Sequence, residues 1–170
     1  MTGDGSDGTG EDAPKPLALL VFAVLVIACF AAFFITQRLK HTPTAVQKFK
    51  LQTRFSPYGP AGHNQEQLSF KLANADEVTV TIINAAGNTV ATLLVDHPVV
   101  RYKQFTLRWN GRRGTAHGYA QITSPGGRAI LIPRIHGAIA SPGEYRVEVA
   151  LRKQGHPVIS PYSFTLVGRR

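Results

Sequence analysis

The chain has 170 residues, of which 19 are Lys or Arg and 10 are Asp or Glu, so its formal net charge is +9. A single cysteine excludes an intrachain disulfide, and the length suits one domain with a real hydrophobic core. The charge is uneven: Met1–Pro16 hold four acidic residues against one lysine, whereas residues 37–170 hold 18 basic residues against six acidic ones. Such a basic segment either accumulates near anionic polymers and headgroups or serves only solubility.

The N-terminal part predicts a tail followed by a membrane span. Residues 1–16 are rich in Gly, Ser, Thr and Asp without apolar periodicity, which predicts a disordered acidic tail. Residues 17–36 hold no charge, no Gly and no Pro. A helix of about 20 apolar residues covers the roughly 30 Å of bilayer hydrocarbon, so this run predicts one transmembrane helix. Cys29 lies inside it and is expected to be inert; a lipoprotein signal is disfavoured because the apolar run continues past it.

Residues 37–54 predict a basic juxtamembrane stalk with room for a first strand. Beyond them the apolar pattern changes to the alternation that half-buried strands require. The alternating positions are Leu68, Phe70 and Leu72, then Val78, Val80 and Ile82, then Phe105, Leu107 and Trp109, and finally Tyr145, Val147 and Val149. Turn signals at 85–88 and 124–127 predict two hairpins. About seven to nine short strands without a helical period predict an all-β sandwich over residues 55–170.

Three segments in order resemble a known module. They are the opening Phe55-Ser56-Pro57, the stretch Val78–Val90 with its Asn-Ala-Ala-Gly turn, and the Trp109–Arg112 turn followed later by Gly143–Val147. Together they resemble the immunoglobulin-like domain of the flagellar hook-capping protein and of many secreted bacterial surface proteins. The resemblance implies an immunoglobulin-like sandwich with an extra hairpin inserted at about 114–142. The Asp and Asn residues that often follow the opening are missing here, which places any calcium site in doubt.

Six side chains are expected in the structural core. They are Trp109, Tyr145, Phe105, Leu107, Val80 and Ile82. The indole of Trp109 is large enough to close one end of a two-sheet core, and the turn behind it is supplied by Asn-Gly. The hydroxyl of Tyr145 would need a backbone partner if its ring points inward.

The sequence contains no sign of a reactive centre. The six acidic residues of the domain form no convincing carboxylate pair, and the scattered histidines share no metal-ligand spacing. No nucleophile elbow, phosphate-binding loop or dinucleotide fingerprint is present. We therefore expect no enzyme activity, no metal and no cofactor. An enzyme acting on wall glycans would need two of the six carboxylates within about 10 Å in a cleft.

Together with the membrane span, the resemblance implies a membrane-anchored, noncatalytic immunoglobulin-like module of the bacterial cell envelope. It would bind an anionic wall polymer, lipid headgroups or a protein partner. Nucleic acid is disfavoured because the alternation predicts that the aromatic residues among the basic ones are buried in the core and cannot stack on bases. The expected anionic contacts are Arg38, Lys40, Lys48, Lys50, Arg101, Lys103, Arg112 and Arg113.

Orientation is open at this point. The resemblance places the domain outside the cell, but basic residues follow the span and only Lys15 precedes it. The positive-inside rule, which is weakest for long translocated domains, would place the domain in the cytoplasm. The alternative is therefore a cytoplasm-facing basic domain that binds anionic lipid or nucleic acid.

Overall fold

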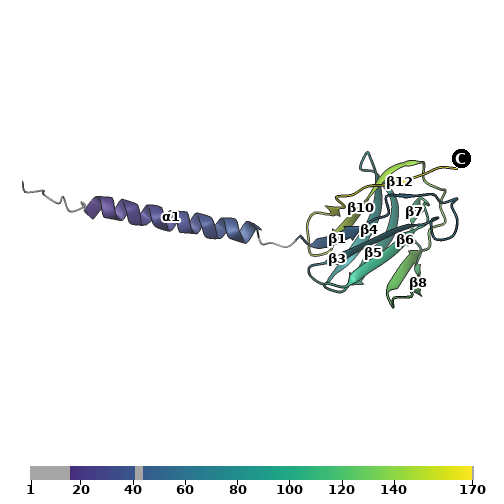
Figure 1. The fold of residues 1–170 in the computed structure, drawn as a ribbon, viewed down its shortest axis with the longest axis horizontal. Coiled ribbons are helices and arrows are strands. Elements are labelled where there is room, and N and C mark those ends of the chain that lie inside the picture. The colour runs from purple at the N-terminus through teal and green to yellow at the C-terminus, as the bar shows by residue number, and fades with distance from the viewer. Residues whose placement is uncertain (1–15, 41–43, 170) are drawn as a thin grey trace, which may run out of the picture. The chain divides into compact units, whose positions relative to one another are not determined.

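The computed structural model describes residues 16–40 and 44–169, with the backbone alone described at 37–40. The expected acidic tail lies outside the described residues except for Pro16, where the helix begins. The chain divides into two units, Met1–Pro43 and Thr44–Arg170. The first contains one helix and the second contains all the strands (Figure 1).

Helix α1 spans Pro16–Lys40. Pro16 suits the first helical position because its missing N–H would have no intrahelical acceptor there. Within it, Pro16–Thr36 is a segment of 21 residues that is long and apolar enough to cross a membrane. The apolar side chains from Leu17 to Ile35 are exposed apart from the half-buried Val26, so nothing in the described part of the chain covers them. A helix that is apolar on all sides is typical of a membrane span.

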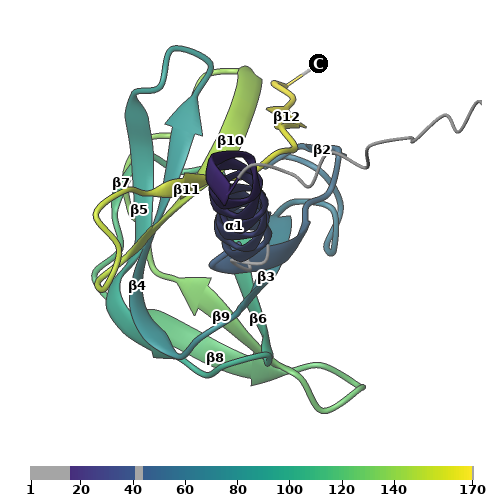
Figure 2. The ribbon, with the colours of Figure 1, turned by 90° about the vertical axis from the view of Figure 1, so that its left-hand side faces the viewer.

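The second unit is a sandwich of two facing sheets (Figure 2). Sheet A has the order β1-β3-β6-β9-β8, with bounds Val46–Lys50, Glu66–Leu72, Gln104–Trp109, Ala129–Pro133 and Tyr119–Thr123. Sheet B has the order β2-β12-β10-β4-β5-β7, with bounds Arg54–Phe55, Phe164–Leu166, Gly143–Leu151, Asp76–Asn84, Thr89–Val99 and Gly114–Thr115. A short strand β11, Val158–Ile159, also pairs with β10. The protein is therefore mainly β, as the alternation predicts.

Both predicted hairpins are present, because their turn residues can adopt the backbone that a tight reversal needs. Strands β4 and β5 are joined by residues 85–88, where Gly87 has φ 80° and Asn84 Oδ1 accepts from the N–H of Asn88. Strands β8 and β9 are joined by residues 124–128 and pair from Tyr119–Pro133 to Thr123–Ala129. This second hairpin falls within the expected insertion at 114–142 and lies beside β6 through the parallel pairing of β9.

A first strand lies within residues 37–54, where the sequence left room for one. Strand β1 lies inside the expected stalk at 37–54 and pairs with β3, so the folded region starts near Val46 and not at Phe55. Strict alternation is absent there because Lys48 has φ 52° and the register with β3 shifts between Gln47 and Lys50. This bulge spaces the inward residues Val46 and Phe49 three apart, which hides the strand from a period-two search.

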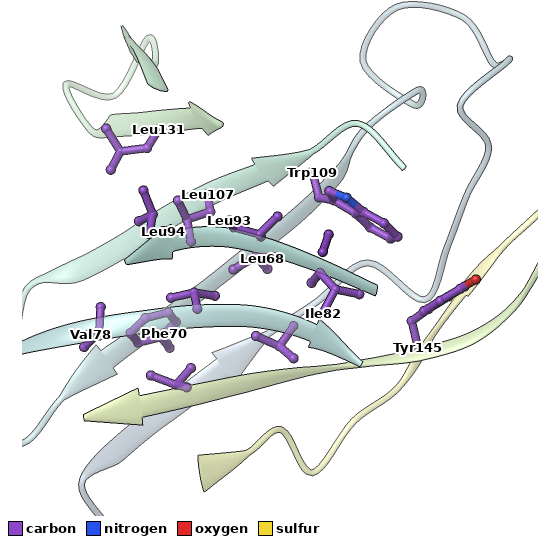
Figure 3. Close-up of a cluster of buried hydrophobic side chains, with 14 of the residues drawn as sticks. Leu68, Phe70, Val78, Ile82, Leu93, Leu94, Leu107, Trp109, Leu131 and Tyr145 are labelled. Carbon is purple, nitrogen blue, oxygen red and sulfur yellow. The ribbon is translucent and has the colours of Figure 1, made fainter. Parts of the chain in front are cut away.

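The core lies between the two sheets and is closed at one end by Trp109 (Figure 3). Its ring centroid is 5.7 Å from that of Phe55, 5.6 Å from Tyr145 and 5.9 Å from Phe164. The indole Nε1–H donates to the carbonyl of Arg112 at 2.9 Å, so the one polar group of the Trp109 side chain has a hydrogen-bond partner. Of the other expected core residues, Leu107, Val80 and Ile82 are fully buried and Tyr145 is 5% exposed.

Phe105 differs from that expectation. It is the second residue of β6, the strand that Trp109 ends, and it is only half-buried. Its ring centroid lies 5.5 Å from that of Phe70 and 5.4 Å from that of His97. The alternation correctly gives the face on which Phe105 lies, but at this end of the sandwich the face is open to solvent.

We predict that Trp109→Ala lowers the free energy of unfolding by about 3–5 kcal/mol, because it empties a closed part of the core. Phe105→Ala should cost less than half as much, since that ring is partly exposed already. Urea unfolding of the full chain in detergent, followed by far-ultraviolet circular dichroism, measures both. Equal losses for the two variants would show that the core is not closed at the Trp109 end.

Candidate functional site: a basic groove

A groove lies at the end of the sandwich where β6 begins. It has a volume of about 560 Å³ and is formed by the end of β5, the start of β6, one residue of β3 and the β8–β9 hairpin. Its lining comprises Lys71, His97, Pro98, Val99, Val100, Lys103, Gln104, Phe105, Gln121, Gly127, Arg128, Ala129 and Leu131. The groove therefore brings together segments that lie up to about 60 residues apart in the chain.

The groove is positively charged. Three of its lining residues are cations, Lys71, Lys103 and Arg128, and none is a carboxylate. Lys103 and Arg128 are exposed, whereas Lys71 is half-buried. Because no acid neutralises them, the three charges create a local positive potential that favours an anionic ligand.

Local structure places two of these cations. Tyr102 has φ 56°, and its N–H donates to the carbonyl of Leu72 at 2.9 Å, which fixes the turn before Lys103. Arg128 follows the 124–127 turn, in which the N–H of Gly127 donates to the carbonyl of Ser124 at 2.8 Å. The Ser124 hydroxyl also accepts from the N–H of Arg128. Short turns with internal hydrogen bonds thus fix the backbone at Lys103 and at Arg128.

Aromatic and amide side chains complete the groove. The ring of His97 lies 5.4 Å from Phe105 and 5.3 Å, edge to face, from Tyr119. Partial burial lowers the pKa of His97, because desolvation disfavours the imidazolium, so this ring is neutral at pH 7. The amides of Gln104 and Gln121 line the same space and can both donate and accept hydrogen bonds.

The basic residues singled out from the sequence do not form one cluster. Of the eight, Lys103 alone lines the groove. Lys48 and Lys50 are exposed on β1. The guanidinium of Arg101 donates to the carbonyl of Ala73 at 3.0 Å and lies over the Tyr102 ring at 4.4 Å. These contacts stabilise the turn before Lys103.

The remaining expected contacts lie elsewhere or outside the described side chains. Arg112 donates to the carbonyl of Gly137 at 2.9 Å, which ties two loops together, and Arg113 is exposed beside it. The backbone at Arg38 and Lys40 is helical, but their side chains fall outside the described residues.

Sequence reasoning missed Lys71, Arg128 and His97. Lys71 lies on the strand face opposite Phe70 and Leu72, and only its place near the sheet end brings it to the groove. Arg128 carries a weak signal, because it directly follows a predicted turn in a segment with no acidic residue. His97 gives no signal at all, since its neighbours Phe105 and Tyr119 come from two other strands.

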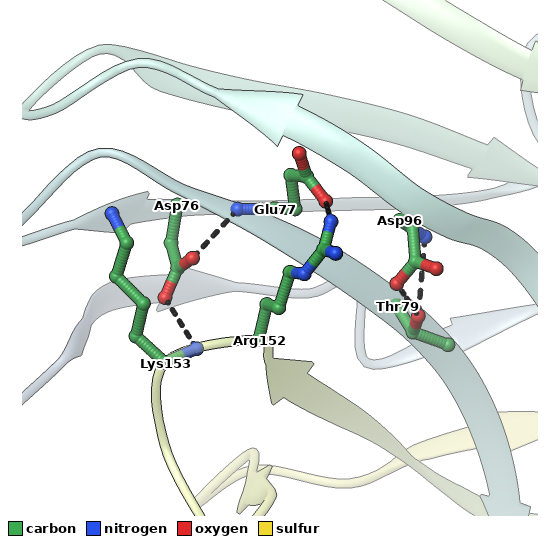
Figure 4. A network of polar contacts seen from close by, with 6 residues as sticks. All are labelled: Asp76, Glu77, Thr79, Asp96, Arg152 and Lys153. Carbon is green, nitrogen blue, oxygen red and sulfur yellow. Dashed lines mark hydrogen bonds and ion pairs between the residues drawn. The ribbon is translucent and has the colours of Figure 1, made fainter.

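Four of the six carboxylates outside the tail make contacts that link β4 to its neighbouring strands β5 and β10. Asp76 accepts from the N–H of Glu77 at 2.9 Å and from that of Lys153 at 3.2 Å, and Glu77 pairs with Arg152 (Figure 4). Asp96 contacts Thr79 across β4 and β5, while Glu148 accepts from the hydroxyl of Thr81 at 3.1 Å. These contacts join β4 to β5 and β10, and none of the four acids lines the basic groove.

Histidines and acids do not gather into a metal site within the described ranges. No group of three or more His, Cys, Asp or Glu side chains there is placed to hold an ion. His117 and His136 stack with ring centroids 6.4 Å apart, but both are exposed. Two exposed imidazoles supply fewer ligands than a structural or catalytic zinc site uses.

Comparison with known proteins adds no residue to this site. No protein-family model matches the chain, and no curated protein sequence matches it. The role of the groove must therefore be inferred from its geometry and charge.

Glu66 is the one fully buried carboxyl in the described part of the chain. It lies opposite Trp109 in the β3–β6 pairing, and its Oε1 accepts from the N–H of Gln52 at 2.7 Å. Its Oε2 has no hydrogen-bond partner among the described residues. Burial raises the pKa of Glu66 to about 8, with the Gln52 bond opposing the shift, so the group is mostly protonated at pH 7.

This burial predicts a pH-dependent stability. Below the ordinary pKa of 4.5 both the folded and unfolded states hold the Glu66 proton, so Glu66 does not make the free energy of unfolding depend on pH there. Between pH 4.5 and about 8 the unfolded state releases that proton first, so the free energy of unfolding falls as pH rises, by about 2–4 kcal/mol. Glu66→Gln should remove that fall, whereas Glu144→Gln, at an exposed site, should keep it. Urea titrations at pH 4.5 and pH 8 measure the free energy of unfolding of the wild type and both variants. An equal fall with pH in the wild type and Glu66→Gln would contradict a buried neutral carboxyl.

Proposed function

We propose that this protein is a membrane-anchored, noncatalytic binding module of the bacterial cell envelope, and that its basic groove binds an anionic polymer. The observation that carries the proposal is the lining of the groove, with Lys71, Lys103 and Arg128 and no carboxylate. A helix long and apolar enough to cross a membrane precedes the sandwich in the chain. An anchored domain with a positive groove is suited to retain a polyanion near the membrane surface.

An immunoglobulin-like fold is part of this proposal. Strands β1, β3 and β6 lie side by side in sheet A, and sheet B contains the order β12-β10-β4-β5. These correspond to the A-B-E and G-F-C-C′ arrangements of immunoglobulin-like sandwiches. Tyr145, near the start of β10, donates its hydroxyl to the carbonyl of Ser141 four residues upstream, as the tyrosine corner of that fold does.

Contacts between the sequence motifs support the same reading. The opening Phe55-Ser56-Pro57 packs against the Trp109–Arg112 turn, with the Phe55 and Trp109 rings 5.7 Å apart. Gly111 has φ 77°, and a Cβ there would lie 2.6 Å from Cγ of Pro57. Two motif elements that are remote in the chain thus form one packed unit, which favours a domain of the hook-capping type. The position beside β6 is taken by the β8–β9 hairpin, and this is where the chain departs from that pattern.

The groove's chemistry favours binding over reaction. Its Gln104 and Gln121 amides suit the hydroxyls of a sugar or polyol, and its cations suit phosphate or carboxylate groups. General acid–base catalysis needs a group that exchanges protons within reach of the substrate. The four acids that tie the strands together lie away from this lining, which supports a noncatalytic role.

We predict that the triple variant Lys71→Ala, Lys103→Ala, Arg128→Ala binds purified bacterial cell wall about tenfold more weakly at low salt. Three partly exposed ion contacts contribute about 0.2–1 kcal/mol each. Cosedimentation of the full chain in detergent measures the affinity, and binding by the unaltered chain should weaken as salt is added.

The matched control removes the same charge elsewhere, as Arg54→Ala, Arg146→Ala, Arg169→Ala, three exposed sites outside the groove. It should lose much less affinity than the groove variant. Equal losses would mean that net charge, and not the groove, determines retention. If neither the unaltered chain nor either variant is retained on cell wall at low salt, the proposed binding to an anionic polymer is wrong.

The proposed orientation places the sandwich outside the cytoplasm, as the resemblance to secreted surface domains implies. One observation favours the alternative of a cytoplasm-facing domain that binds anionic lipid or nucleic acid. Arg38, Lys40, Lys48 and Lys50 all follow the span closely, and the positive-inside rule would keep such a cluster in the cytoplasm.

Protease added to intact cells should separate the two orientations. We predict that an external protease removes the domain from residue 44 onward, as detected by an antibody against that domain, and spares a cytoplasmic control protein. Full protection in intact cells, followed by digestion after lysis, would support the cytoplasmic alternative.

A further inference from the structure

Strand β8 is an edge strand whose outer side is free. It ends sheet A and pairs only with β9 among the described strands. Four of its five residues are exposed, among them Tyr119 at 47% and Ile122 at 38%. Figures 1 and 2 show this hairpin extending from the body of the sandwich.

The hydrogen-bond pattern identifies which backbone groups of β8 point outward. The N–H of Ser124 donates to the carbonyl of Arg128, and that of Arg134 donates to the carbonyl of Gly118. In an antiparallel ladder the residues that bond to the partner alternate, so even-numbered positions face β9. The N–H and C=O groups of Tyr119, Gln121 and Thr123 therefore point away from β9 and have no strand partner there.

The other sheet edges of the described domain carry protection that β8 lacks. Strand β1, at the opposite edge of sheet A, contains Lys48, Lys50 and a bulge. The edge strands of sheet B, β2 and β7, have only two residues each. By contrast β8 has the sequence YAQIT with a regular register, no charge and no Pro. Charges, bulges and short length are the usual means of blocking strand addition, and an edge without them can pair with another strand.

The charge around β8 selects the kind of strand that could pair with it. Residues 112–143 contain four arginines and no Asp or Glu. Arg128 and Arg134, at the two ends of the hairpin, are both exposed. A second copy of β8 would place arginines against arginines, which is unfavourable, whereas an acidic segment would meet opposite charge at both ends.

We propose that the free edge of β8 binds an extended acidic segment of another protein, which adds one strand to sheet A. The N–H and C=O groups of Tyr119, Gln121 and Thr123 supply the main-chain hydrogen bonds. Arg128 and Arg134 select for acidic side chains near the ends of the added strand. Binding at this edge is distinct from polymer binding in the groove, although Arg128 and the Gln121 side chain also line that groove.

A proline at position 121 tests the proposal directly. Gln121→Pro removes an outward N–H without removing a bond to β9, and edge strands tolerate such a proline. Gln121→Ala is the matched control, since it removes the same side chain but keeps the N–H. The probe is a fluorescent peptide of about eight residues alternating valine and glutamate, titrated by anisotropy with the full chain in neutral detergent.

We expect Gln121→Pro to bind the peptide about tenfold more weakly, while Gln121→Ala binds as the unaltered chain does. Thr123→Pro, which blocks another outward N–H, should give the same loss if Gln121→Pro folds poorly by circular dichroism. The groove variant Lys71→Ala, Lys103→Ala should keep peptide binding, which distinguishes this site from the proposed polymer site. No binding by the unaltered chain overturns the proposal.

Three further outcomes also overturn it. Equal peptide binding by Gln121→Pro and Gln121→Ala would show that the edge N–H plays no part. Equally tight binding of a peptide with lysine in place of glutamate would show that the edge does not select an acidic segment. Self-association of the unaltered chain that Gln121→Pro abolishes in sedimentation velocity would assign the edge to a second copy.

Discussion

The architecture depends on the aromatic packing around Trp109, which closes one end of the sandwich. Phe55, Tyr145 and Phe164 come from β2, β10 and β12 of sheet B, and Trp109 comes from β6 of sheet A. Their contacts hold the sheets together at that end, and the positive φ of Gly111 lets the chain turn against Pro57. Because the core is closed there, the opposite end of β6, where Phe105 lies, can remain open without exposing the whole core. The groove occupies that open end.

The β8–β9 hairpin is the element that turns an open sandwich end into a groove. It pairs with β6 through the parallel contact of Leu131 with Leu107, and it contributes Gln121, Arg128 and Leu131 to the lining. The His97 and Tyr119 rings, 5.3 Å apart, join the hairpin to the end of β5 in the other sheet. The same hairpin presents its outer edge to solvent. A single hairpin thus contributes to the proposed polymer site and carries the proposed strand-binding site.

Local patterns predicted the parts of this fold that local physics determines. The alternation in Leu68–Leu72 and Val78–Ile82, and the turns at 85–88 and 124–127, depend on neighbouring residues, and each is present. The exact place of the first strand within residues 37–54 could not be predicted, because the bulge at Lys48 breaks the alternation of β1. The groove could not be predicted, because Lys71, Lys103 and Arg128 converge only through the pairing of distant strands. By charge alone Arg101 and Arg112 are equally good candidates, yet their guanidinium groups donate to backbone carbonyls.

Binding of an anionic polymer in a defined groove at the open end of the sandwich can be tested residue by residue. The most direct measurement is amide chemical-shift mapping of the full chain in detergent, titrated with a soluble fragment of phosphate-rich wall polymer. We predict that the amides whose shifts change are those of residues 97–105, 121 and 127–131, while those around Arg146 on β10 do not change. Small shifts spread evenly over all basic surfaces, Arg146 included, would contradict it, because they would show attraction to net charge without a site.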